Sequence, residues 1–193
     1  MEFRGLTAEE VVCKVEGLGE RESGGYAKLL LYHDPTVDRA ILNETVGSFG
    51  WQAYHYKQDG LLCCRVGIDK YHASKQRNPC FLWRSGVGRK RFEEDQGESS
   101  SAFQRACAMW GIGEELYTAP RILVSANVYR NKKGYHVTDD IFKVLHMQVE
   151  KLPPGKKCIT ELVIARYWKD QQGAWQQELA FDWKKNHADS ENN

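Results

Sequence analysis

The chain has 193 residues, 41% of them hydrophobic and 27% charged, which is ordinary for a soluble globular protein. This length suits one domain with or without an appendage, and it suffices to bury a substantial core. A net charge of +1 excludes a protein that is basic throughout, so any nucleic-acid surface must be local. No apolar run approaches the roughly 18 residues of a membrane span, and no signal-peptide core is present, so we expect a cytoplasmic protein.

The first elements follow from capping and glycine signals. Thr7-Ala-Glu-Glu10 has the pattern of a capping box, which predicts a short helix ending before Gly17. Residues 21–32 predict a strand whose start carries Arg21 and Lys28 on either side of a glycine pair. Asp34 and Pro35 then suit the N-cap and first turn of a helix over residues 35–46.

The middle of the chain predicts a β-hairpin. Residues 50–56 alternate large and small side chains, and residues 61–68 follow an Asp59-Gly60 turn. A further strand is predicted near residues 79–83, followed by a loop over residues 86–97.

The most informative segment is 98–120, ESSSAFQRACAMWGIGEELYTAP. Its serines offer oxygens to the amides of a helix start, and its apolar residues recur at spacings of three and four. Gly111 and Gly113 end that pattern. Trp110 lies on the apolar face, so we expect it to pack in the core.

The remaining residues predict a small β region. A hairpin tip is expected at Lys132-Lys133-Gly134. The tail 184–193 is polar and is expected to be flexible. The expected strands are 121–129, 143–150, 158–169 and 175–183, the last two pairing across Gly173.

Three features, taken in order, resemble the Rad-fifty-two / Sak family of single-strand annealing recombinases. They are Arg-x-x-Gly-Gly at residues 21–25, the Gly50-Trp51 pair, and the helix with Arg105 followed by Trp-Gly-Ile-Gly and Leu-Tyr. The resemblance covers about residues 5–120, and the branch of the family that the chain resembles is the phage branch. The family often has cations where this chain has Gln104 and Ala108.

Together the elements and the resemblance predict an α+β fold. The expected architecture is a twisted antiparallel β-meander packed on a long helix, a β-β-β-α core, with a small additional C-terminal β region. One DNA-binding domain is expected over residues 1–183, with its core at about 5–120 and the β region at about 121–183.

The resemblance implies a groove for the DNA backbone. It puts Arg21 in that groove, Arg105 against the phosphates, and Lys28 where the family often has a lysine. Basic clusters beside the helix and at the hairpin tip extend the set. The candidate DNA-binding residues are Arg21, Lys28, Arg89, Lys90, Arg91, Arg105, Lys132 and Lys133.

The implied activity is ATP-independent binding of single-stranded DNA and annealing of complementary strands in recombination or repair. The chain has no phosphate-cradling Gly-x4-Gly-Lys-Ser/Thr loop, and we expect no covalent catalysis, cofactor or metal. A ring-shaped homo-oligomer is implied, with a single-strand binding protein or an exonuclease as further candidate partners.

Two alternatives stay open. Glu93-Glu94-Asp95 and Asp139-Asp140 are acidic clusters of the kind that hold Mg²⁺ in a DNA nuclease or resolvase. The other alternative is a non-enzymatic adaptor that binds a protein. Six cysteines (Cys13, Cys63, Cys64, Cys80, Cys107 and Cys158) show neither disulfide nor zinc spacing, which predicts reduced thiols that are mostly buried.

Overall fold

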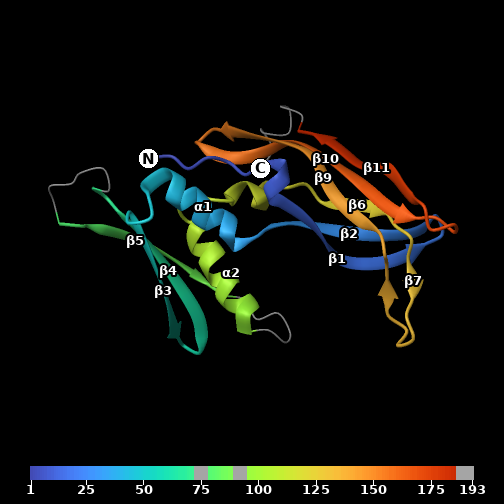
Figure 1. The fold of residues 1–193 in the computed structure, drawn as a ribbon, viewed down its shortest axis with the longest axis horizontal. Helices are drawn as coiled ribbons and strands as arrows, with labels where there is room; N and C mark the ends of the chain where they lie inside the picture. Colours follow the sequence, from blue (N-terminus) through green and yellow to red (C-terminus); the bar gives the residue numbers. More distant parts are fainter. Residues whose placement is uncertain (72–77, 89–94, 186–193) are drawn as a thin grey trace. The chain divides into compact units, whose positions relative to one another are not determined.

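A computed structural model describes residues 1–71, 78–88 and 95–185 (Figure 1). The chain forms two compact units, each assembled from two segments. Unit 1 contains Met1–Leu6 and Asp34–Glu114, and unit 2 contains Thr7–His33 and the chain from Glu115 onward. Each unit is described by itself below.

Unit 2 is built on one six-stranded antiparallel sheet with the strand order β11-β10-β9-β1-β2-β6. The edge strands β6 and β11 also contact each other, so the sheet curls. Its concave side is filled by apolar residues such as Leu31, Val124 and Ile164. The strands are β1 (Val11–Arg21), β2 (Gly24–His33), β6 (Ile122–Ser125), β9 (Ile141–Leu152), β10 (Lys156–Lys169) and β11 (Trp175–Lys184).

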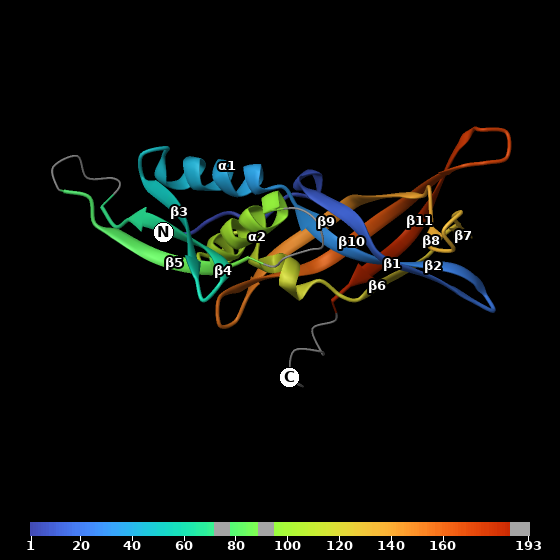
Figure 2. The same ribbon diagram turned by 90° about the horizontal axis from the view of Figure 1, so that it is seen from below.

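A short second hairpin extends from this sheet. It is formed by β7 (Tyr129–Arg130) and β8 (His136–Val137), which pair antiparallel. Figures 1 and 2 both place it at the same end of unit 2 as the turn between β1 and β2.

Unit 1 is built on a three-stranded antiparallel sheet of order β3-β4-β5. One face of this sheet packs against helix α2, and α1 contacts both α2 and β3. The elements are α1 (Pro35–Val46), β3 (Trp51–Gln58), β4 (Leu61–Asp69), β5 (Phe81–Val87) and α2 (Asp95–Ala108). Two 3₁₀ turns complete the chain, at Ala8–Glu10 and Glu114–Thr118.

The predicted fold class is wrong. The molecule is mostly β, with eleven strands and two short helices in the part of the chain that the structure describes. Its largest sheet joins β1 and β2 to β6, β9, β10 and β11, so the predicted C-terminal β region supplies four of the six strands and is not a small addition. The pairing of Val12 with Lys143 makes this join, and no local pattern in either segment indicates it.

The predicted helix after Thr7 is also wrong. The Thr7 amide does donate to the Glu10 carboxylate at 2.9 Å, but only one 3₁₀ turn follows. From Val11 the chain is strand β1, which pairs with both β2 and β9. Its β-branched valines favour a strand, and tertiary pairing outweighs the local helix signal.

Local signals elsewhere are confirmed. The Asp34 carboxylate caps α1 by accepting from the Thr36 amide at 2.8 Å, and α1 has the expected bounds 35–46. The Asp59-Gly60 turn joins β3 to β4, and both residues have positive φ. Helix α2 begins at Asp95, so the serines lie inside it and do not cap its start.

No helix in the described residues is long and apolar enough to cross a bilayer. The last residues of the predicted flexible tail, 186–193, lie outside the described part of the chain.

Candidate nucleic-acid interface

Arg21 is the last residue of β1 and is exposed where the β1–β2 hairpin turns. Its guanidinium carbon lies 4.6 Å from the centre of the Tyr26 ring, a cation–π distance. Tyr26 in turn lies across Gly19, where an added Cβ would come within 2.6 Å of the phenol oxygen. The tyrosine therefore holds the Arg21 cation at the tip of the hairpin.

Lys132 and Lys133 occupy the turn between β7 and β8, as the sequence predicts. The Asn131 side-chain oxygen accepts from the backbone amides of Lys133 and Tyr135, both at 3.0 Å. Gly134 has a φ of +81°, which a residue with a side chain rarely adopts. The turn is thus fixed by its own backbone contacts, and both lysines are exposed.

The β7–β8 hairpin contacts strand β1 through β8. His136 Nε2 of β8 lies 3.8 Å from the Glu20 carboxylate of β1. On the next strand, a Cβ at Gly25 would meet the Ala126 carbonyl at 2.6 Å. We call the cations of this end the basic hairpin pair, defined as Arg21, Arg130, Lys132 and Lys133.

The acids at this end are partly engaged. Asp139 accepts from the Tyr129 hydroxyl at 2.9 Å, which raises the pKa of that phenol. Glu20 is the partner of His136, and Glu22 is the acid beside Arg21 in the turn. The four cations of the basic hairpin pair thus outnumber these three acids by one.

Lys28 belongs to the middle of β2 and forms an ion pair with Glu16 of β1 at 2.7 Å. An ion-paired lysine offers less charge to a phosphate than one without an acid beside it. The structure thus separates Lys28 from the other predicted residues of unit 2.

Arg105 belongs to unit 1, in the last turn of α2, and is half-buried. The small residues near Arg105 allow α2 and β5 to pack closely. A Cβ at Gly86 of β5 would lie 2.4 Å from the Ala106 amide nitrogen and 2.6 Å from the Ala102 carbonyl oxygen. The helix backbone therefore rests directly on the strand, and the alanines make that approach possible.

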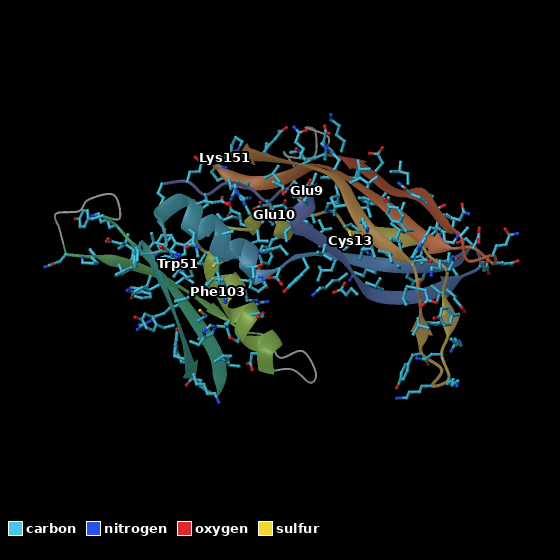
Figure 3. All side chains as sticks on the ribbon, viewed as in Figure 1. Glu9, Glu10, Cys13, Trp51, Phe103 and Lys151 are labelled. Carbon is cyan, nitrogen blue, oxygen red and sulfur yellow. The ribbon has the colours of Figure 1, made fainter. Side chains whose placement is uncertain are left out.

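The aromatic residues of the recognised motifs also have packing roles. The ring centres of Trp51 and Phe103 are 6.2 Å apart, and the two rings are tilted by 43°. Figure 3 labels both side chains. The Trp51 indole donates to Asn43 of α1 at 2.8 Å. Gly50 precedes it because a Cβ there would collide with the Val46 carbonyl at 2.1 Å. The Gly-Trp pair thus ties α1 and α2 to the small sheet.

Three predicted residues, Arg89, Lys90 and Arg91, lie outside the described residues. So do Glu93 and Glu94 of the acidic cluster that the nuclease alternative uses. In the other cluster, Asp139-Asp140, the carboxylate of Asp140 makes structural contacts. It accepts from Arg166 Nε and from the Asn127 amide, both at 2.7 Å. Within residues 1–71, 78–88 and 95–185, no group of three or more His, Cys, Asp or Glu side chains is placed to hold a metal ion.

Sequence reasoning missed a second exposed surface, on the small sheet of unit 1. The face opposite α2 carries four aromatic rings and one arginine, which we call the ring face: Tyr54, Tyr56, Phe81, Trp83 and Arg65. The aromatic residues stand at alternate positions in both β3 and β5, and that spacing is the available signal. It indicates one shared face but not whether that face is open.

Comparison of the chain with models of protein families, with curated proteins and with solved structures finds no match.

Proposed function

We propose that this protein binds single-stranded DNA and anneals complementary strands without ATP. The carrying observation is the basic hairpin pair, in which two hairpins at one end of unit 2 carry exposed cations (Figures 1 and 2). The sequence resemblance assigns the same role to Arg21 independently of this geometry. Membership of a phage-type recombination system follows from that resemblance.

The chemistry needs no bond to be made or broken in the protein. Lysine and arginine neutralise phosphates and release counterions, which gives affinity without sequence preference. Annealing then requires extended strands held at high local concentration, with their bases free to pair. Arg105 of unit 1 is the cation through which the motif helix would contact a DNA phosphate.

The test measures binding and annealing with the purified full-length chain. Fluorescence anisotropy follows a labelled oligothymidylate over a range of salt concentrations. A second assay follows the annealing of two complementary labelled strands in EDTA without nucleotide. We expect salt-dependent binding and faster annealing than in buffer alone.

Variants locate the contacts. Each of Arg21→Ala, Lys132→Ala, Lys133→Ala and Arg105→Ala should reduce the slope of log affinity against log salt by about 0.7, the value for one single-strand phosphate. Lys156→Ala is the matched control because strand register puts Lys156, an exposed lysine, at the opposite end of the sheet from Arg21. Unchanged slopes in all four variants would show that these cations do not bind DNA.

The same assays separate the alternatives. A nuclease would shorten the oligonucleotide in Mg²⁺ and leave it intact in EDTA. A protein-binding adaptor would not retain the oligonucleotide even at low salt. Either result contradicts annealing as the function.

A further inference from the structure

The ring face lies on the side of the small sheet that α2 does not cover. Residues paired across antiparallel strands share a face. Tyr54 pairs with Arg65 of β4, and Gly67 of β4 pairs with Trp83. Gly86, three pairs beyond Trp83 along β5, points the other way, onto α2. The rings and the helix therefore occupy opposite sides of one sheet.

The rings form a connected surface. The centre of the Trp83 ring is 5.6 Å from that of Tyr54 and 5.8 Å from that of Phe81. A Cβ at Gly67 would lie 2.6 Å from the Trp83 ring carbons, so the indole lies across the glycine and close to the strand. The absence of a side chain at Gly67 thus lets the largest ring of the face rest on the sheet.

Arg65 sits among these rings. Its guanidinium carbon is 4.8 Å from the Trp83 ring centre and 5.5 Å from that of Tyr54. Arg65 is exposed, and Tyr54 is 49% exposed although it is a large ring in a strand. A planar cation beside two rings is an arrangement on which nucleobases stack.

In strands β3 to β5 the ring face carries one cation, Arg65, and one acid, Asp69. Lys57 and Arg84 lie on the face that packs against α2, because they pair with Leu62 and Val66. The Asp69 carboxylate already accepts from the backbone amides of Tyr71 and Cys80.

We propose that the ring face binds the bases of single-stranded nucleic acid by stacking, with Tyr54, Trp83 and Arg65 as the contact residues. This inference rests on the proposed function and deepens it, because it assigns base contacts to unit 1 while the basic hairpin pair contacts phosphates. Stacking accepts any base, which suits a protein that binds strands without sequence preference.

The test compares two ligands that share their phosphates. The full-length chain is titrated with oligothymidylate and with an abasic oligonucleotide of the same length, both at low salt. We expect the parent protein to bind oligothymidylate at least about fivefold more tightly, the lower bound for one stacked base. The Tyr54→Ala/Arg65→Gln double variant should lose most of that preference and keep its affinity for the abasic strand.

Controls keep the outcomes distinct. Tyr54→Phe retains a ring and should bind like the parent, and Trp83→Leu should behave like the double variant. Melting temperatures establish that each variant is folded. If a variant is not folded, the single variant Arg65→Gln takes its place in the comparison of the two ligands.

Three results would overturn the proposal. If the parent binds the two ligands equally, base stacking does not contribute to affinity. Phosphate binding, and with it the proposed function, would still hold. Binding of neither ligand removes both. If the Tyr54→Ala/Arg65→Gln variant kept the base preference but had a different oligomer mass from the parent by light scattering, the ring face would be a contact with a second copy.

Discussion

Trp110 shows how a single motif residue can serve packing inside a candidate DNA-binding protein. Its indole N–H donates to the Val66 carbonyl of β4 at 3.0 Å, and the Arg84 guanidinium lies 5.0 Å from its ring. The ring is half-buried. These contacts fix the end of α2 to the small sheet, so the ring is not free to stack on bases.

Trp110→Ala should therefore destabilise the protein by about 3 kcal/mol, the lower end of the range for loss of a packed tryptophan. Trp110→Phe keeps the ring but loses the hydrogen bond to Val66, and should cost about 1 kcal/mol. Urea unfolding measures both. A stable Trp110→Ala variant that has lost DNA binding would instead make Trp110 a contact residue.

The buried thiol of Cys64 should make the stability of the protein depend on pH. Its side chain is buried at the centre of the small sheet, and burial raises the pKa of the thiol from its usual 9.0 to about 11, against a smaller lowering by the Tyr54 amide. The unfolded thiol thus ionises before the folded one. The contribution of this thiol to the free energy of unfolding is therefore complete below pH 9, and it decreases as the pH rises toward 11.

From this group alone, the free energy of unfolding should fall by about 1.4 kcal/mol per pH unit between about pH 9 and pH 11. Urea unfolding at several pH values, under reducing conditions, measures the slope. The slope should be shallower in Cys64→Ala, whereas Cys80→Ala, at an exposed position, is the control. Identical slopes in parent and Cys64→Ala would contradict this account.

Helix α2 owes its position to the direct contact of its backbone with β5. Gly86→Ala would place a methyl group 2.4 Å from the Ala106 nitrogen, and backbone cannot move aside as a flexible side chain can. The substitution should destabilise unit 1 by about 1–3 kcal/mol, the usual cost of overpacking.

Gly97→Ala, inside α2, is the matched control for Gly86→Ala in β5. An added Cβ there meets nothing within 4 Å, and alanine favours helix over glycine by about 0.5–1 kcal/mol. Chemical unfolding should show the two substitutions shifting the midpoint in opposite directions. Equal shifts would mean that α2 does not rest on β5 as described.

The whole molecule raises the question of assembly. The net charge of +1 gives one chain little attraction for DNA beyond its local cations. Repetition of the same surface in a homo-oligomer would raise the affinity for a long strand without any new contact. We therefore expect a multimer, as the family resemblance implies.

Light scattering on the purified protein at micromolar concentration should give a mass that is a multiple of the chain mass. The measurement is repeated with and without oligothymidylate, since DNA can promote assembly. A strict monomer in both conditions would count heavily against the annealing function.

The sequence alone determined the elements whose signals lie within a few residues. The Asp34 cap and Pro35 set the start of α1, and the Asp59-Gly60 turn set the hairpin of β3 and β4. Of the proposed phosphate contacts, the Lys132-Lys133 tip was found in the same way, from its turn residues. These signals are local because caps and tight turns are completed by neighbouring backbone groups.

Only the tertiary structure decided the large sheet and the ring face. Strand β1 exists because it pairs with β2 and β9, and Val12 and Lys143 are far apart in the sequence. The alternation of Tyr54 and Tyr56 fixes a shared face, but α2 decides which face is covered. Pairing partners and helix placement depend on contacts between distant segments, which local patterns do not encode.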